Sequence, residues 1–275
     1  MKPIWFVGCG NMAGAMIEGW RSAGANLDDS VVIRPSGKPV EGMRVITSYA
    51  EAGPAPRLVV LGCKPQQLDD VVTKLSAHLT DQTVVVSILA GVEVATLREK
   101  FWTAGAIVRA LPNLPVAVRR GVVALYGDEL PGEVRDELSS LFVLLGYAIW
   151  TNTEAQLAAI GSVAGAGPAY VARFIDALSK AGVERGLSQE TATTIAIETV
   201  LGTAWMATAT RETMDDVVRR VASPNGTTEA GLAVLGRDDV LNKLVSLTIG
   251  AAARRGDELA EEAKSAKLAS EAPLA

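Results

Sequence analysis

Two kinds of hydrophobic pattern divide the chain near residue 152. Before this point, short continuous apolar runs alternate with amphipathic stretches, and each run ends at glycine, proline or a polar residue. The apolar runs predict strands at residues 3–8, 30–34, 58–63, 82–89, 104–113, 121–127 and 147–151. Continuous apolar strands that alternate with helices are typical of a parallel sheet covered on both faces. Residues 1–152 are therefore predicted to form a doubly wound α/β domain.

After this point the apolar residues recur only at helical spacing. The predicted helices are 154–165, 168–186, 188–210, 213–222, 227–236 and 239–264. We expect residues 153–267 to form one all-helical domain and residues 268–275, which are small and polar, to fray. The helix at 188–210 is apolar on most of its faces, and such a helix must be covered on all sides. The helical domain is therefore expected to assemble with a second copy as a homodimer, and a larger oligomer stays open.

Composition and charge narrow the class of protein. The 275 residues are 49% hydrophobic and 21% charged, which is typical of a globular chain, and the net charge is −5. A nucleic acid or an anionic membrane surface is therefore not expected as a partner. The chain has only two cysteines and one histidine, so that no metal site is expected, and we expect a cytoplasmic protein. The histidine, His78, is predicted to be exposed and without a catalytic role.

A glycine-rich loop follows the first predicted strand. The sequence GCGNMAG places Gly8, Gly10 and Ala13 at the spacing of a dinucleotide-binding loop, directly before a helix. Glycines permit the turn and the close approach of a pyrophosphate, and a small third residue lets helix and strand pack closely. The first helical residues, Asn11 and Met12, would offer unpaired N–H groups to the anion. The loop predicts a Rossmann-type cofactor site, with a purely structural turn as the alternative.

The end of the second strand bears on which dinucleotide is bound. An NAD-binding site usually has an acidic residue here for the ribose 2′-hydroxyl. This chain has none in VVIRPSGKP and instead carries Arg34, Ser36 and Lys38. Basic side chains suit a 2′-phosphate, so that NADPH is the expected cofactor and NADH stays possible. The alternative is that these are ordinary solvated charges of a loop.

Further cofactor contacts are expected where the other parallel strands end, because dinucleotides lie across the carboxyl edge of such a sheet. The candidates are Cys63, Lys64, Pro65, Ala90, Gly91 and Asn113. Lys64 could equally be a solvent-exposed lysine, and the expected role of Cys9 and Cys63 is that of small apolar residues. Asn113 lies between two prolines, which would hold its amide rigidly.

Six segments together resemble one family. GCGNMAG, CKPQ, SILAGV, RALPNLP, GAGPAY and SPNGTTEAGL occur in the order and at the spacing found in pyrroline-5-carboxylate reductases. The resemblance spans essentially the whole chain. It implies a Rossmann domain followed by a helical dimerisation domain that interlocks with its twin. It also implies reduction of the cyclic imine L-1-pyrroline-5-carboxylate to L-proline by NAD(P)H.

The same resemblance implies roles for the loop SPNGTT. Its substrate-binding residues would hold the substrate carboxylate, and they are Ser223, Asn225, Gly226, Thr227 and Thr228. Thr228 would in addition donate or accept a hydrogen bond at the imine nitrogen and is the one catalytic candidate. Hydroxyls and N–H groups at the start of a helix do favour an anion. A plain helix cap by Thr227 or Thr228 is the alternative.

The chain departs from the family pattern at four positions. Alanines replace two serines before GPAY, leucine replaces a threonine after Asn113, and asparagine replaces a glycine of the substrate loop; the residues are Ala164, Ala166, Leu114 and Asn225. These changes leave open a shifted substrate, such as a six-membered cyclic imine acid, and a protein that binds NADP without turnover. A β-hydroxyacid dehydrogenase is disfavoured, because Glu184 stands where that family has an asparagine four residues after Lys180.

Overall fold

The structure, a computed structural model, describes the backbone of residues 1–271 and the side chains of residues 1–262. The chain forms two compact units. The first, called the sheet unit, comprises Met1–Ala166 and the chain from Ala252 onward, and the second, the helical unit, comprises Gly167–Ala251. The predicted domain limits at residues 152 and 267 stay a prediction. Residues 272–275 of the predicted tail lie outside the described residues.

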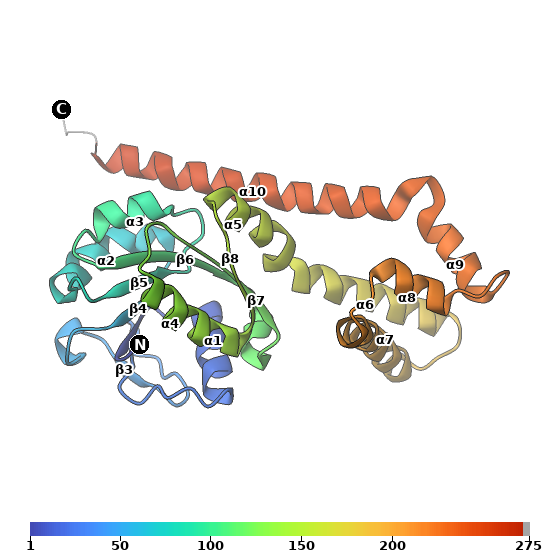
Figure 1. The fold of residues 1–275 in the computed structure, drawn as a ribbon, viewed down its shortest axis with the longest axis horizontal. Coiled ribbons are helices and arrows are strands. Elements are labelled where there is room, and N and C mark those ends of the chain that lie inside the picture. The colour runs from blue at the N-terminus through green and yellow to red at the C-terminus, as the bar shows by residue number, and fades with distance from the viewer. Residues whose placement is uncertain (272–275) are drawn as a thin grey trace. The chain divides into compact units, whose positions relative to one another are not determined.

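The sheet unit is built on eight strands in the order β3-β2-β1-β4-β5-β6-β7-β8 (Figure 1). Their bounds are β1 Ile4–Val7, β2 Val31–Ile33, β3 Arg44–Ile46, β4 Leu58–Leu61, β5 Val84–Ser87, β6 Ala106–Pro112, β7 Gly121–Gly127 and β8 Gly146–Trp150. All neighbouring strands are parallel except β6 and β7. Only residues 113–120 join this pair, and a parallel crossover needs a dozen residues or more. The predicted parallel sheet therefore contains one antiparallel pair.

Helices cover the sheet on both faces, as Figure 1 shows. In β1, Phe6 belongs to one hydrophobic cluster and its neighbour Trp5 to another, because successive side chains of a strand point to opposite faces. The first cluster contains α1 and α4, and the second contains α2 and α3. The helices are α1 Asn11–Ser22, α2 Leu68–Leu75, α3 Val94–Lys100, α4 Gly132–Phe142 and α5 Glu154–Ile160. The predicted doubly wound α/β fold is confirmed.

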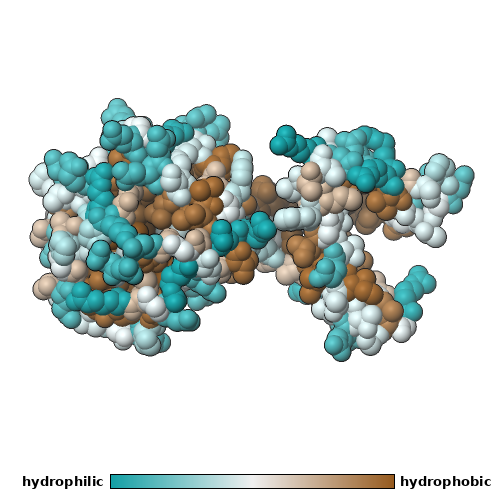
Figure 2. Space-filling view, turned by 60° about the horizontal axis from the view of Figure 1, so that its bottom comes forward, coloured by the Kyte–Doolittle hydropathy of each residue, from teal (hydrophilic) through white to brown (hydrophobic). Residues whose placement is uncertain are grey.

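The helical unit consists of helices only, within the described residues. They are α6 Gly167–Glu184, α7 Gln189–Thr210, α8 Met214–Val221, α9 Thr227–Gly236 and the first part of α10, which runs over Val240–Glu271. Helices α6 and α7 approach closely, and Ser179 Oγ lies 2.9 Å from Thr193 Oγ1. Many large apolar side chains of this unit are exposed, such as Phe174, Leu201 and Leu247, and Figure 2 shows apolar patches on its surface. The all-helical C-terminal region is confirmed.

Two details of the structure differ from the sequence-based expectations. Strand β3 was not predicted, because three residues, of which Arg44 is exposed, carry no clear pattern. His78 is half-buried rather than exposed: its ring stacks on Tyr49 at 5.8 Å between centroids and lies 5.5 Å from the ring of Trp5. The histidine therefore takes part in the packing of the sheet unit.

Candidate functional site

Gly8 lies where β1 passes into the glycine loop. Its φ of 82° is in the left-handed region, and a β-carbon here would stand 2.7 Å from the backbone nitrogen of Cys63. Its N–H donates to the carbonyl of Ile33, at 2.8 Å. Only glycine fits a position pressed between the ends of three neighbouring strands. The loop therefore brings the carboxyl ends of β1, β2 and β4 together.

The start of α1 is open to an anion. Gly10 is the N-cap residue, is exposed, and has no other heavy atom within 4 Å of where a β-carbon would lie. The N–H groups of Asn11 and Met12 come in the first turn, where a helix supplies no carbonyl partner. Ala13 is buried, and a β-carbon at Gly62 would lie 3.1 Å from that of Ala13. Small residues thus let α1 start close to β4, and the helix dipole favours an anion at this point.

The three polar residues after β2 form one cluster. Arg34 Nε donates to Ser36 Oγ at 3.0 Å, and the backbone N–H of Lys38 reaches the same hydroxyl at 3.4 Å. Gly37 turns the chain with φ 59°, and its N–H donates to the carbonyl of Arg34. The serine therefore holds the arginine and the lysine backbone in one turn, with two cationic side chains at the end of the strand. A phosphate group suits such a cluster.

The residues after β4 have mixed surroundings. Cys63 and Pro65 are half-buried, whereas Lys64 is exposed and its backbone N–H donates to Gln67 Oε1 at 3.2 Å. Burial raises the pKa of the Cys63 thiol, and burial, opposed by the Arg34 guanidinium, raises the pKa of the Cys9 thiol. Burial therefore favours the thiol form of both cysteines over the thiolate, which is the reactive form.

Ala90 and Gly91 follow β5 and differ in their surroundings. Ala90 is exposed. Gly91 has φ 73°, and a β-carbon there would lie 3.1 Å from Cα of Ala260 in α10. The second part of α10 therefore passes against this strand-end loop, within the sheet unit.

Asn113 is buried, and its amide is bonded inside the protein. Nδ2 donates to the carbonyl of Ala164 at 2.9 Å, and Oδ1 accepts the N–H of Val122 at 2.8 Å. Ala164 belongs to a single π-helical turn, Gly161–Gly165, that follows α5. The asparagine therefore ties the end of β6 to β7 and to this turn, and its predicted contact with the cofactor stays a prediction.

An ion pair that we did not predict lies next to these loops. Arg109 Nη1, on β6, contacts Glu154 Oε2 at 2.7 Å, and the other carboxylate oxygen accepts the N–H of Val94 at 2.6 Å. The arginine side chain is 10% exposed. Glu154 thereby joins the first residue of α3 to β6 and to α5. An arginine inside the apolar run AIVRALP was the one signal for this pair.

The predicted substrate loop lies in the helical unit and is a tight turn. The N–H of Gly226 donates to the carbonyl of Ser223 at 3.0 Å, and Asn225 has φ 56°. Proline at the second position and a left-handed third residue make a type II turn. A β-carbon at Gly226 would lie 2.5 Å from Ser223 Oγ and 2.9 Å from the Ser223 carbonyl oxygen, so that a larger residue here would force the turn to shift.

Helix α9 starts directly after this turn. Its N-cap is Gly226, so that neither Thr227 nor Thr228 is the cap that the alternative interpretation required. Thr227 is exposed and Thr228 half-buried, and neither hydroxyl has a protein partner among the described residues. The loop thus keeps two hydroxyls and the first-turn N–H groups open. We did not foresee the role of Glu229, whose Oε2 accepts the N–H of Asn225 at 2.6 Å.

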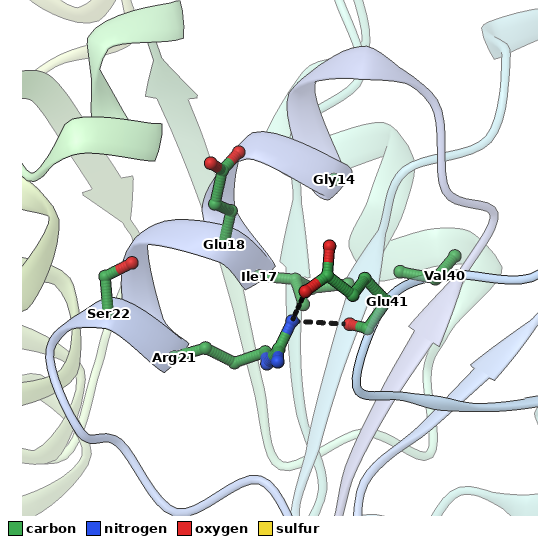
Figure 3. A pocket seen from close by; sticks show the side chains of 7 residues that line it. All are labelled: Gly14, Ile17, Glu18, Arg21, Ser22, Val40 and Glu41. Atoms are coloured by element: carbon green, nitrogen blue, oxygen red, sulfur yellow. Dashed lines mark hydrogen bonds and ion pairs between the residues drawn. The ribbon is translucent and has the colours of Figure 1, made fainter.

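An open cavity of about 610 Å³ lies elsewhere on the sheet unit (Figure 3). It runs along the middle and end of α1, and Figure 3 shows Arg21 reaching Glu41 across it, with a 2.8 Å bond to the glutamate carbonyl. Its lining residues are Gly14, Ile17, Glu18, Arg21, Ser22, Val40 and Glu41. None of them is a predicted site residue, so that the cavity is separate from the groups described above.

Comparison with known proteins assigns the family. Residues 154–259 match the family described as pyrroline-5-carboxylate reductase dimerisation, and residues 3–91 match NADP oxidoreductase coenzyme F420-dependent. A pyrroline-5-carboxylate reductase of Pseudomonas aeruginosa is 35% identical over 269 residues, which cover 94% of this chain and 97% of that protein. The chain belongs to the pyrroline-5-carboxylate reductase family. The reductase of Pisum sativum is 33% identical over 93% of this chain and 95% of its own.

Solved structures agree with this membership in the pyrroline-5-carboxylate reductase family. The enzyme of Coxiella burnetii is 30% identical, with a TM-score of 0.83 over 93% of this chain and 97% of that chain. The enzyme of Plasmodium falciparum, solved with NADP bound, has a TM-score of 0.82 over 94% and 97% of the two chains, at 23% identity. The second likeness concerns the fold, and the resemblance identified in the sequence is confirmed.

Proposed function

We propose that this protein reduces L-1-pyrroline-5-carboxylate to L-proline with NADPH. The observation that carries the proposal is the full-length similarity to the Pseudomonas aeruginosa reductase. The open start of α1 and the basic turn after β2 support it, because they provide separate places for the pyrophosphate and the 2′-phosphate of NADPH. NADH, which lacks the 2′-phosphate, would use only the first of these.

The fit between the chain and a dinucleotide rests on the glycine loop. A side chain at Gly8 or Gly62 would fill the approach to α1, and Gly10 leaves it open. Gly8, Gly10, Asn11 and Met12 would hold the pyrophosphate, and Arg34, Ser36 and Lys38 the 2′-phosphate. The remaining predicted contacts, along the strand ends, are Cys63, Lys64, Pro65, Ala90, Gly91 and Asn113.

The chemistry makes few demands on acid–base groups. When bound, NADPH would supply a hydride from its nicotinamide ring to the imine carbon and become NADP+, and the C=N π electrons would become the lone pair of the ring nitrogen. A protonated imine is already an electrophile, so that the chain mainly orients two rings. Thr228 would hydrogen-bond the ring nitrogen, and Ser223, Asn225, Gly226, Thr227 and Thr228 would hold the carboxylate at the start of α9.

The deciding experiment measures NADPH and NADH oxidation with pyrroline-5-carboxylate and with its six-membered homologue. We expect kcat/KM to be highest for NADPH with the five-membered ring. A higher value for the six-membered ring would identify a cyclic imine reductase with a shifted substrate. Tight NADPH binding without oxidation by either compound would contradict the proposal and favour a non-catalytic NADP-binding protein.

A variant tests the role of the threonine. Thr228→Ala is expected to lower kcat about 10- to 100-fold, the range of a hydrogen bond made at the reacting group, with little change in the KM for NADPH. Thr228→Ser keeps the hydroxyl and should retain most of the activity. An unchanged kcat in Thr228→Ala would remove Thr228 from the mechanism.

The proposed assembly is a homodimer through the helical region, in the cytoplasm, with neither nucleic acid nor membrane as a partner. The match to a dimerisation family over residues 154–259 supports self-association. One helical stretch, 154–184, is by length and composition apolar enough to cross a membrane. We propose that a second copy covers its apolar side chains. Sedimentation without detergent tests this: a dimer supports it, and protein recovered only with detergent contradicts it.

A further inference from the structure

Glu229 makes an unusual contact at the start of α9. It is the third residue of the helix, and its carboxylate turns back to accept the N–H of Asn225 at 2.6 Å. In a capping box the acidic residue at this position bonds the N–H of the N-cap residue. Here the N-cap is Gly226, whose N–H is already used by the carbonyl of Ser223. The carboxylate therefore reaches one residue further, to the residue before the cap.

The residue it reaches is the strained one. Asn225 has φ 56°, a region that costs a side-chain-bearing residue free energy, although asparagine tolerates it better than most. A glycine here would adopt this φ without that cost. A hydrogen bond from a backbone N–H to an ionised carboxylate is about twice as strong as a neutral one. The contact between Glu229 and Asn225 thus stabilises the conformation that the turn requires.

This type II turn sets the direction of the groups that are proposed to bind the substrate. It places Gly226 as N-cap and leaves the first-turn N–H groups and both threonine hydroxyls without partners in the part of the protein that the structure describes. The contact also keeps the carboxylate of Glu229 bonded to the N–H of Asn225. A free carboxylate would otherwise be attracted to the same open helix terminus and compete there with a substrate carboxylate.

We propose that Glu229 is a positioning residue for the substrate carboxylate: by bonding the N–H of Asn225 it holds the type II turn and keeps the α9 terminus open. The inference rests on the proposed function. It goes beyond that function because it assigns a role to an exposed acid that touches neither reactant. It also explains how the turn is maintained with asparagine at a position that favours glycine.

The test compares Glu229→Ala with wild type in the full-length enzyme. We expect the KM for pyrroline-5-carboxylate to rise about 10-fold, a loss of about 1.4 kcal/mol of binding free energy, with kcat lowered less than about 3-fold. The KM for NADPH should not change. Glu229→Gln keeps an acceptor oxygen and should raise the KM only about 2- to 3-fold. Glu133→Ala removes an exposed acid from the first turn of α4 and is the matched control, with wild-type constants expected.

A second background separates positioning from a merely structural role. In Asn225→Gly the left-handed φ no longer needs support, so that adding Glu229→Ala should change the KM less than about 2-fold. An equal rise of the KM in both backgrounds would overturn the proposal. An unchanged KM for pyrroline-5-carboxylate in Glu229→Ala would overturn it as well, and so would an equal rise of the KM for NADPH.

Hydrogen exchange provides a readout that does not depend on activity. In the wild-type enzyme the Asn225 amide should exchange slowly, and in Glu229→Gln and Glu229→Ala peptides covering residues 222–230 should exchange faster. Unchanged exchange in these peptides would overturn the proposal. If the wild type reduces no cyclic imine acid, the proposed function fails, and the exchange experiment still decides whether Glu229 holds the turn.

Discussion

The two units of this protein bury apolar side chains in very different ways. The largest fully buried side chains, among them Trp5, Trp20, Phe101 and Phe142, all belong to the sheet unit. In the helical unit the buried side chains among the described residues are small ones and a single valine: Ser179, Ala192, Ala196, Ala207 and Val217. Many of its large apolar side chains are exposed instead.

This difference indicates what each unit needs in order to be stable. Full burial of a large apolar side chain contributes about 1.5–3 kcal/mol, and the sheet unit obtains this from its own two clusters. The helical unit obtains little of it within one chain. The match of residues 154–259 to a dimerisation family fits this deficit, since a second copy would cover the exposed side chains. The sheet unit is expected to depend on its core, and the helical unit on assembly.

The largest expected effect breaks the assembly. Leu201→Asp places a carboxylate on α7, at a side chain that is 57% exposed in one chain. If a second copy covers this position, burial of the charge should weaken dimerisation by at least about 1,000-fold, or about 4 kcal/mol. Sedimentation equilibrium measures the change. Val143→Asp, at a 56% exposed side chain of the sheet unit, is the matched control and should stay assembled. A Leu201→Asp protein that remains dimeric would contradict the role assigned to α7.

The next effect breaks the core of the sheet unit. Phe142 is fully buried and meets the ring of Trp20 edge-on, at 5.5 Å between centroids. Phe142→Ala leaves a cavity and should lower the free energy of unfolding by about 3–5 kcal/mol, measured by urea denaturation. Dimerisation of the remaining folded protein should be unchanged. A loss below about 1 kcal/mol would show that the cluster around Trp20 collapses into the space.

The strands and the glycine loop could be predicted because their patterns are local. A run such as LVVL is long enough and apolar enough to indicate a strand that is buried on both faces. The direction of β7 is not in its own residues, and only the short connection 113–120 indicates it. Strand β3 has three residues and no such pattern, so that neighbouring strands, rather than its sequence, define it.

The site was predictable only in part for a similar reason. Gly8 and Gly10 follow a spacing that can be read from the chain, and the acid-free end of β2 can be read as well. The bond from Glu229 depends on the left-handed Asn225 and on the N–H of Gly226 being in use, which are features of the folded turn. Glu154 meets Arg109 across 45 residues of sequence, and no spacing rule connects the two.

The third effect concerns the ion pair between Arg109 on β6 and Glu154 on α5. Glu154→Ala removes the partner of Arg109, whose Nε is already buried without a hydrogen-bond partner, and leaves Val94 N–H without its acceptor. Loss of one member of a buried pair costs about 3–5 kcal/mol, and partial exposure of Glu154 reduces the expected loss to about 2 kcal/mol. Urea denaturation measures it. Glu137→Ala, whose ion pairs are 3.8 and 3.9 Å long, is the control with little expected change. Equal losses in the two variants would remove the special role of Glu154.

The smallest effect compares two helix N-caps, one in each unit. Thr213 caps α8 in the helical unit by accepting the N–H of Asp216, and Thr153 caps α5 in the sheet unit by accepting that of Gln156. Thr→Ala at an N-cap costs about 1 kcal/mol. Each helix has one buried residue, Val217 in α8 and Leu157 in α5, but α5 is also held by the ion pair of Glu154, so that hydrogen exchange should quicken more in α8 than in α5.

The cap of α8 should also depend on pH. The pKa of Asp216 is lowered, first by the hydrogen bond from the Thr213 hydroxyl and then by the Thr213 N–H and by Arg219. A lowered pKa in the folded state contributes stability above the unfolded value of about 4, and this contribution is lost as the pH falls through the folded value. The protection of the α8 amides, measured against the exchange rate of an unfolded chain at the same pH, should therefore fall on acidification below about pH 4 in wild type, and less so in Thr213→Ala. The same acid dependence in both proteins would show that the threonine hydroxyl does not hold the carboxylate of Asp216.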